Sequence, residues 1–184
     1  MATTLLLARH GETDSNRERR WQGQTQTALN DTGREQARTL ADALVAEPPD
    51  LIFCSDLDRA RETAEIIGSR LGREVRPDPR LREVDIGHLA GRSVSEMQGD
   101  WDRPLDYLLA KQPAVFEEMR SRVIGALLEI AAAYNGKCIL VVTHGGPIAA
   151  AWLAGGGEPA DRPTVRNCHV QRIRVEAGKI TRLD

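Results

Sequence analysis

One stretch of the sequence decides the fold class: residues 138–147 read CILVVTHGGP. Its first five residues are apolar, which is typical of a strand that is buried on both faces, as in a parallel sheet. Thr143 and His144 end this strand, and Pro147 favours the start of a helix directly afterwards. A buried strand that leads straight into a helix is the repeating unit of an α/β fold.

The same pattern recurs along the chain. Further strands are expected at Thr3–Ala8, Asp50–Cys54 and Val170–Val175. The apolar and polar residues of Val170–Val175 alternate, so this terminal strand is expected to be half-exposed. Apolar residues three or four positions apart predict helices over 32–44, 57–71, 113–134 and 147–153. Residues 100–112 fit neither pattern. Strands that alternate with helices predict a single α/β domain over residues 1–184, a three-layer sandwich whose mostly parallel central sheet is flanked by helices.

Several residues stand where helix ends are expected. Thr32–Glu35 and Ser93–Glu96 have the spacing of a capping box. Ser55-Asp56 are good N-cap residues for the helix that follows them. Gly72 should close that helix, and Pro113 suits the first position of the longest one.

Charge and composition exclude several classes of protein. The chain has 25 Lys and Arg against 27 Asp and Glu, a net charge of −2, which argues against a nucleic-acid binder with a broad basic surface. No apolar run approaches the roughly 18 residues of a membrane span. Met1–Ala8 lacks the basic start of a signal peptide, so a cytoplasmic location is expected. Three cysteines are too few and too scattered for a disulfide framework or a zinc site.

Polar residues gather at the ends of three predicted strands. Arg9-His10 follows the first strand, Ser55-Asp56 with Arg59 follows the second, and Thr143-His144 follows the third. Ligands of open α/β sheets bind at the carboxyl ends of the strands. If these strands are neighbours, two arginines and two histidines converge, and such a cluster suits a phosphoryl group. Each piece alone is better explained by ordinary surface polarity, but the three together favour an anion site.

The strand ends carry motifs that resemble those of the histidine phosphatase (phosphoglycerate mutase-like) superfamily, in its small phosphatase branch. The matching segments are Arg9-His10-Gly11-Glu12-Thr13 with Asn16, Gln22-Gly23, Ser55-Asp56-Leu57 with Arg59-Ala60, Leu81-Arg82-Glu83, and Thr143-His144-Gly145-Gly146. They stand in the family's order and cover residues 4 to about 150.

The resemblance implies a phosphoglycerate mutase-like fold and a metal-independent phosphomonoesterase that hydrolyses a small phosphorylated metabolite through a phosphohistidine. It implies that His10 is the nucleophile and Glu83 the proton donor to the leaving oxygen. It implies phosphate binding by Arg9, Arg59 and His144. It implies substrate-binding positions at Asn16, Gln22, Gly23 and Gly145. No cofactor and no metal ion are expected, because the arginines and His144 supply the positive charge.

Alternatives remain at the sequence level. Asp85 or Glu12 could replace Glu83 as the acid. Mutases of the family carry a long cap between the acid and the closing histidine, whereas only residues 84–143 lie between them here, which favours hydrolysis over mutase chemistry. A catalytically inactive binding relative is the rival from another class. The leaving group stays open, as does the oligomeric state.

The expected rim of the site departs from the family pattern. Lys111-Gln112-Pro113-Ala114-Val115 replaces a common Gly-Glu-Ser segment, and Leu89 stands where an aromatic residue is common. Trp21 and Trp101 could line an entrance, whereas Trp152 is expected in the core. His88 and His169 have no motif around them and are expected to be surface or packing residues.

Overall fold

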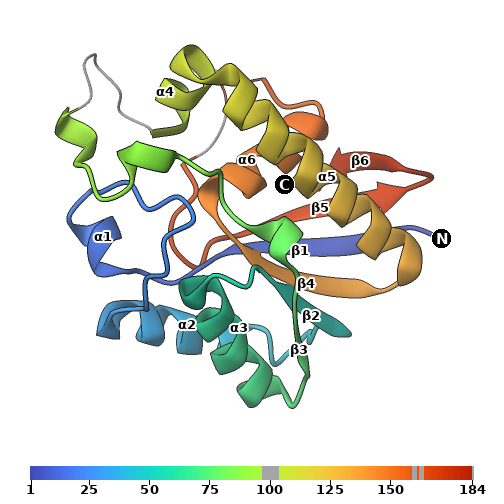
Figure 1. The fold of residues 1–184 in the computed structure, drawn as a ribbon. Helices are drawn as coiled ribbons and strands as arrows, with labels where there is room; N and C mark the ends of the chain where they lie inside the picture. Colours follow the sequence, from blue (N-terminus) through green and yellow to red (C-terminus); the bar gives the residue numbers. More distant parts are fainter. Residues whose placement is uncertain (97–103, 159–160, 162–163, 184) are drawn as a thin grey trace.

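A six-stranded sheet forms the centre of the computed structural model, which describes residues 1–96, 104–158, 161 and 164–183 (Figure 1). The strand order is β3-β2-β4-β1-β5-β6. The strands are β1 (Thr3–Arg9), β2 (Leu51–Cys54), β3 (Val75–Pro77), β4 (Cys138–Thr143), β5 (Val170–Glu176) and β6 (Lys179–Arg182). The first four in the sheet order pair in parallel, and β5 is antiparallel to both β1 and β6. The predicted α/β fold with a mostly parallel sheet is confirmed.

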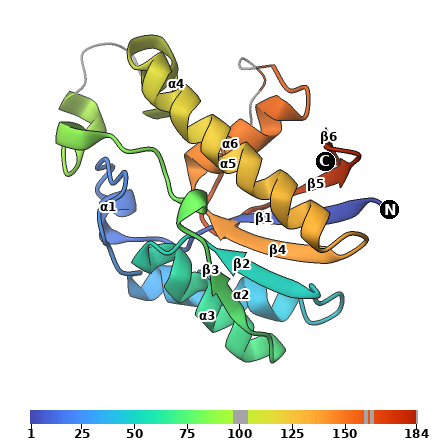
Figure 2. The same cartoon turned by 45° about the vertical axis from the view of Figure 1, so that its right-hand side comes forward.

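The described helices are α1 (Asp14–Arg17), α2 (Asp31–Ala43), α3 (Asp58–Leu71), α4 (Pro104–Lys111), α5 (Pro113–Ala133) and α6 (Gly145–Ala154). Of these, α5 and α6 cover one face of the sheet, and α2 and α3 cover the other (Figure 2). Successive side chains of a strand point to opposite faces. Leu5 and Leu7 of β1 therefore pack on the side of α5 and α6, whereas Leu6 and Ala8 pack on the side of α2 and α3 (Figure 2). This alternation produces the three predicted layers.

Most predicted helix ends agree with the structure. Pro113 is the first residue of α5, and Gly72 ends α3 in the left-handed region at φ 63°. Helix α6 begins at Gly145, two residues before the predicted start at Pro147. Within the ambiguous segment, residues 104–111 form α4, and residues 97–103 lie outside the described part. No helix among the described residues is long and apolar enough to cross a membrane.

The predicted helix caps are wrong at two places. Helix α2 is capped by Asn30, whose side-chain oxygen accepts from the N–H of Gly33 at 2.8 Å, and not by Thr32. Helix α3 has Leu57 at its N-cap position and therefore no side-chain cap; the Ser55 hydroxyl accepts from the N–H of Leu57 at 3.3 Å and lies 2.8 Å from His144. After Ser93, residues Val94–Glu96 form a 3-10 turn, and the residues that would continue it into a helix lie outside the described part.

The sequence pattern predicted β5 as the last strand, and this prediction is wrong. A turn at Ala177 and Gly178, with φ values of 49° and 76°, reverses the chain and adds β6 at the sheet edge. Two 3-10 turns, Pro79–Leu81 and Gly87–Leu89, lie on either side of Glu83 in the connection from β3 to α4.

Candidate active site

His10 and His144 lie side by side at the carboxyl ends of two neighbouring strands. In the β1–β4 register Arg9 stands opposite Thr143, so the residues that follow them are adjacent. The backbone N–H of His10 donates to the carbonyl oxygen of Thr143 at 2.9 Å, and the two imidazole centroids are 5.2 Å apart. Both rings are buried. The parallel pairing of β1 with β4 therefore builds a histidine pair from residues that are far apart in the sequence.

The hydrogen bonds of His10 define its tautomer. Its Nδ1 lies 2.7 Å from the carbonyl oxygen of Gly11, and its Nε2 lies 3.2 Å from Nε of Arg59. A carbonyl can only accept and a guanidinium can only donate, so Nδ1 carries the proton and Nε2 presents a lone pair. Burial, and then the positive charges of Arg59 and Arg9, hold the pKa of His10 well below its ordinary value. The ring is therefore neutral at physiological pH.

Arg59 comes from the first turn of α3 and is only 1% exposed. Its Nη2 donates to the carbonyl of Gly23 at 2.7 Å, and its Nη1 donates to the carbonyl of Thr25 at 2.9 Å. Burial lowers the pKa of Arg59 to about 10, although Glu83 opposes this shift, so the side chain remains a cation. Gly23 thus belongs to the site through its carbonyl, which fixes the guanidinium beside His10.

The site contains two buried polar atoms without a hydrogen-bond partner among the described residues, Nε of Arg9 and Nδ1 of His144. Nη1 of Arg9 donates to the carbonyl of Val165 at 2.7 Å. Nε2 of His144 lies 2.8 Å from Oγ of Ser55. Buried polar groups in proteins are normally paired, and each unpaired one is costly. Each of these two atoms is therefore free to pair with a polar atom of a ligand that binds beside His10.

Burial also sets the charge of the second histidine. It lowers the pKa of His144 well below the ordinary value, and the nearby charge of Arg59 adds to this effect. The neutral ring of His144 has one N–H. If the Ser55 hydroxyl donates to Nε2, that N–H is on Nδ1, where it can donate to an oxygen of a ligand.

Glu83 reaches the same region from the connection between β3 and α4. Its Oε1 accepts from the N–H of Val84 at 2.9 Å, and its Oε2 accepts from the N–H of Gly146 at 3.1 Å. A Cβ at position 146 would collide with this carboxylate, so the close approach requires glycine there. Gly145, the first residue of α6, presents an N–H that has no partner within the helix.

The two rival carboxylates lie elsewhere. Asp85 is exposed and accepts from the N–H of Gly87 at 3.0 Å. Glu12 accepts from the side-chain amide of Asn30 at 2.9 Å, at the start of α2. Of these three carboxylates, Glu83 alone has a hydrogen bond to the helix that begins next to His144.

The predicted substrate-binding amides support the loop around His10. Asn16 and Thr13 form a capping box around α1, and the Asn16 side-chain oxygen accepts from the N–H of Thr13 at 3.2 Å. The side-chain oxygen of Gln22 accepts from the hydroxyls of Thr13 and Thr27, each at 3.1 Å. These bonds occupy the oxygens of both amides, so the NH₂ groups are the ends that a substrate could contact.

Sequence reasoning missed the segment before β5. The Asn167 side chain donates to the carbonyl of His10 at 2.9 Å, and the N–H of Cys168 donates to the carbonyl of Arg9 at 3.0 Å. Together with Val165, these residues fix the end of β1 from the far part of the chain. The segment has no motif, and most of its contacts are made by backbone atoms, so the sequence offers no signal for them.

The other aromatic residues and histidines are placed as follows. Trp21 is buried and packs edge-on against Tyr107 of α4, with ring centroids 5.8 Å apart. Trp152 is buried, as expected for a core residue, and Trp101 lies outside the described residues. His88 and His169 are exposed, as expected.

Comparison with known proteins identifies the family. A family model described as the histidine phosphatase superfamily (branch 1) matches residues 5–183. The chain belongs to this superfamily. This histidine phosphatase is 34% identical to "Probable phosphoglycerate mutase GpmB" of Photorhabdus laumondii, over 98% of the chain and 94% of the relative. It is 35% identical to the glucosyl-3-phosphoglycerate phosphatase of Mycobacterium tuberculosis, over 99% of the chain and 77% of the relative.

The solved structure of Bacillus stearothermophilus YhfR superposes on this histidine phosphatase with a TM-score of 0.85 and 30% identity, covering 98% of this chain and 95% of that one. The protein is therefore an enzyme of the phosphatase type with a phosphoglycerate mutase-like fold.

Proposed function

We propose that this histidine phosphatase is a cytoplasmic, metal-independent phosphomonoesterase that hydrolyses a small phosphorylated metabolite through a phosphohistidine at His10. The observation that carries the proposal is the neutral His10 ring, which presents the lone pair of Nε2 beside the Arg59 guanidinium. The unpartnered donors of Arg9 and His144 support it, because a phosphoryl group has oxygens for both.

In the first step Nε2 of His10 attacks phosphorus. The P–N bond forms as the P–O bond to the leaving group breaks, and Glu83, in its protonated form, gives its proton to the departing oxygen. Arg9, Arg59 and His144 stabilise the charge that spreads over the other phosphoryl oxygens during transfer. The guanidinium of Arg59 already lies at Nε2, so it is close to the oxygens of a phosphorus bound there.

In the second step a water molecule attacks the phosphohistidine. Glu83, now a carboxylate, takes the proton from this water, the P–N electron pair returns to Nε2, and inorganic phosphate leaves. Two in-line transfers replace one difficult displacement. Because the same carboxyl gives a proton in one step and takes one in the next, the cycle restores the starting enzyme.

The proposed substrate class is a small phosphate monoester with an alcohol leaving group. The names of the relatives refer to phosphoglycerate and glucosyl-3-phosphoglycerate, which are compounds of this type. The mutase name favours a second candidate, a phosphoglycerate-type mutase. Incubation with 3-phosphoglycerate and a trace of 2,3-bisphosphoglycerate distinguishes the two. Inorganic phosphate as the main product supports the phosphatase, whereas 2-phosphoglycerate would establish the mutase.

The first test is capture of the intermediate. Rapid acid-free quenching of the enzyme with ³²P-labelled p-nitrophenyl phosphate in EDTA should give an acid-labile, base-stable label on the wild-type protein and none on His10→Ala. Turnover in EDTA tests metal independence at the same time. A stable label on another residue would reject His10 as the nucleophile, and no turnover at all would favour an inactive binding relative.

The second test separates the acid from the nucleophile. An alkoxide must be protonated as it departs, whereas p-nitrophenolate leaves without help. Glu83→Gln should therefore reduce kcat/KM about 10²- to 10⁴-fold on glycerol phosphate, the range of general acid catalysis, and much less on p-nitrophenyl phosphate. Asp85→Asn is the matched control and should leave both values unchanged. Equal losses on the two substrates for Glu83→Gln would reject Glu83 as the general acid and make Asp85 the next candidate.

A further inference from the structure

Residues 80–84, here called the acid loop, carry Glu83 but belong to no strand of the sheet. The carbonyls of such a segment lack the partners that a sheet would supply, and backbone carbonyls inside a protein need donors. The carbonyls of four consecutive residues accept from side chains of other elements: Arg80, Leu81, Arg82 and Glu83. The position of Glu83 is therefore fixed from outside the loop.

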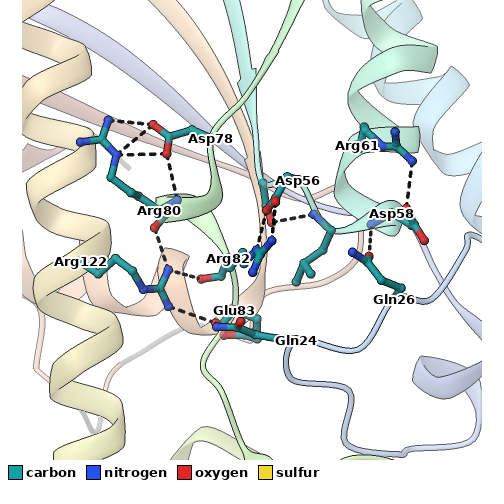
Figure 3. Close-up of polar contacts among 12 residues, drawn as sticks. Gln24, Gln26, Asp56, Asp58, Arg61, Asp78, Arg80, Arg82, Glu83 and Arg122 are labelled. Carbon is teal, nitrogen blue, oxygen red and sulfur yellow. Dashed lines mark hydrogen bonds and ion pairs between the residues drawn. The ribbon is translucent and has the colours of Figure 1, made fainter.

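Arg122 of α5 supplies most of these bonds. Its Nη1 donates to the carbonyls of Arg80 at 2.8 Å and Arg82 at 3.0 Å, and its Nη2 donates to the carbonyl of Glu83 at 3.2 Å (Figure 3). Only 21% of the Arg122 side chain is exposed, and its Nε lies 3.6 Å from a carboxylate oxygen of Glu118. The Nη1 and Nη2 groups of Arg122 thus donate to carbonyls of the acid loop rather than to a carboxylate.

Other contacts hold the loop at different points. The Thr143 hydroxyl donates to the carbonyl of Leu81 at 2.7 Å. The Arg82 side chain makes two bonds to Asp56, at 2.7 and 2.6 Å (Figure 3). At Glu83 itself, the side chain of Gln24 joins Arg122 on the same carbonyl, at 3.1 Å. Arg122 differs from the other side chains because it bonds to three carbonyls of the loop, those of Arg80, Arg82 and Glu83.

We propose that Arg122 is a positioning residue for catalysis, which holds the acid loop so that the Glu83 carboxyl faces the leaving group. The proposal rests on the proposed role of Glu83 as the general acid. The carboxylate is oriented by the N–H groups of Val84 and Gly146, and these bonds can form only if the Glu83 backbone stays in place. A planar guanidinium has donors in a fixed fork, which suits three carbonyls of one loop better than an ammonium does.

The test is the dependence of kcat/KM on the leaving group. This ratio covers the steps up to loss of the leaving group, so slow hydrolysis of the phosphohistidine does not mask it. Arg122→Met keeps a long unbranched side chain and removes all three bonds. We expect a loss of about 10- to 100-fold on glycerol phosphate, since a misplacement of about 1 Å can cost this much. On p-nitrophenyl phosphate, whose leaving group needs no proton, we expect little loss.

Arg120→Met is the matched control on the same helix. Arg120 bonds to Glu117 one turn away and is 40% exposed, so the same substitution there should leave both values unchanged. A double-mutant cycle completes the test: in the Glu83→Gln background, Arg122→Met should cause almost no further loss on glycerol phosphate, because Arg122 acts through Glu83.

Equal losses on the two substrates, full additivity with Glu83→Gln, or no loss on either substrate would each overturn the proposal. If Glu83→Gln by itself loses as much kcat/KM on p-nitrophenyl phosphate as on glycerol phosphate, Glu83 is not the general acid. That result rejects the proposed function, and it differs from the results that reject only the role of Arg122. If Arg122→Met does not fold, Arg122→Lys takes its place. That variant keeps the charge without the fork, and it must show the same preference for loss on glycerol phosphate or the proposal is wrong.

Discussion

Replacing His10 with glutamine should remove about half of the pH dependence that the two buried histidines, His10 and His144, give to the stability of this protein. Both rings are buried as neutral groups, and burial, followed by the charge of Arg59, holds both pKa values well below 6.5. In the unfolded chain both histidines titrate near 6.5. As the pH falls below that value, the unfolded state binds protons that the folded state does not, so stability present above pH 6.5 is lost.

The size of this effect follows from the two proton equilibria. One proton bound only by the unfolded state changes the free energy of unfolding by about 1.4 kcal/mol per pH unit. Between pH 7.5 and 5.5 an unfolded histidine of ordinary pKa goes from mostly neutral to mostly charged, which gives about 1.4 kcal/mol for each ring and about 3 kcal/mol for both. His10→Gln should therefore reduce the loss of stability over this range by about 1.4 kcal/mol.

Urea unfolding at half-unit steps from pH 5.5 to 8.5 measures the effect. The quantity to compare is the difference in free energy of unfolding between His10→Gln and the wild type, because carboxylates that titrate in both proteins cancel. The difference should change through the window around pH 6.5 and stay constant from pH 7.5 to 8.5. A difference that is constant over the whole range would mean that folded His10 takes up a proton as readily as the unfolded chain does, and the neutral nucleophile would be refuted.

Three other substitutions test the packing and the site. Gly33→Ala should destabilise the fold by about 3 kcal/mol, because the new Cβ would fall among the backbone atoms of Glu12, which cannot move aside easily. Gly125→Ala, in open space on α5, should stabilise it by about 0.5–1 kcal/mol, and urea unfolding of both variants checks the pair. Ser55→Ala should lower kcat/KM equally on glycerol phosphate and p-nitrophenyl phosphate, because we propose that its partner His144 binds the phosphoryl group of either substrate; a selective loss on glycerol phosphate would contradict this assignment.

The fold could be predicted where burial leaves a clear pattern in the sequence. The strands β1 and β4 lie at the centre of the sheet, so both of their faces are buried and their residues form unbroken apolar runs. The edge strand β6 was missed because only Ile180 of its four residues is buried, and four residues cannot show an alternation. The N-cap Asn30 was missed because the loop before α2 offers several polar residues, and only the folded chain selects one of them.

The site could be predicted as far as it is built from strand ends. The positions of Arg9, His10 and His144 follow from the rule that ligands bind at the carboxyl ends of parallel strands. What could not be predicted is the set of side chains and carbonyls that hold these residues in place. Asn167 and Arg122 come from distant segments without motifs, and both of them act on backbone carbonyls, which every residue possesses. A sequence pattern cannot show which carbonyl a distant side chain will reach.

The burial that keeps His10, the proposed nucleophile, neutral also affects the donors around it. Burial holds the pKa of His10 well below its ordinary value, and the buried Nε of Arg9 and Nδ1 of His144 have no hydrogen-bond partner among the described residues. Unpaired buried polar groups lower the stability of a fold. In the proposed reaction, a bound phosphoryl group accepts from both atoms, and its negative charge lies next to the two arginines. We therefore expect stability lost at these two atoms to be recovered as affinity for the charge that develops during phosphoryl transfer.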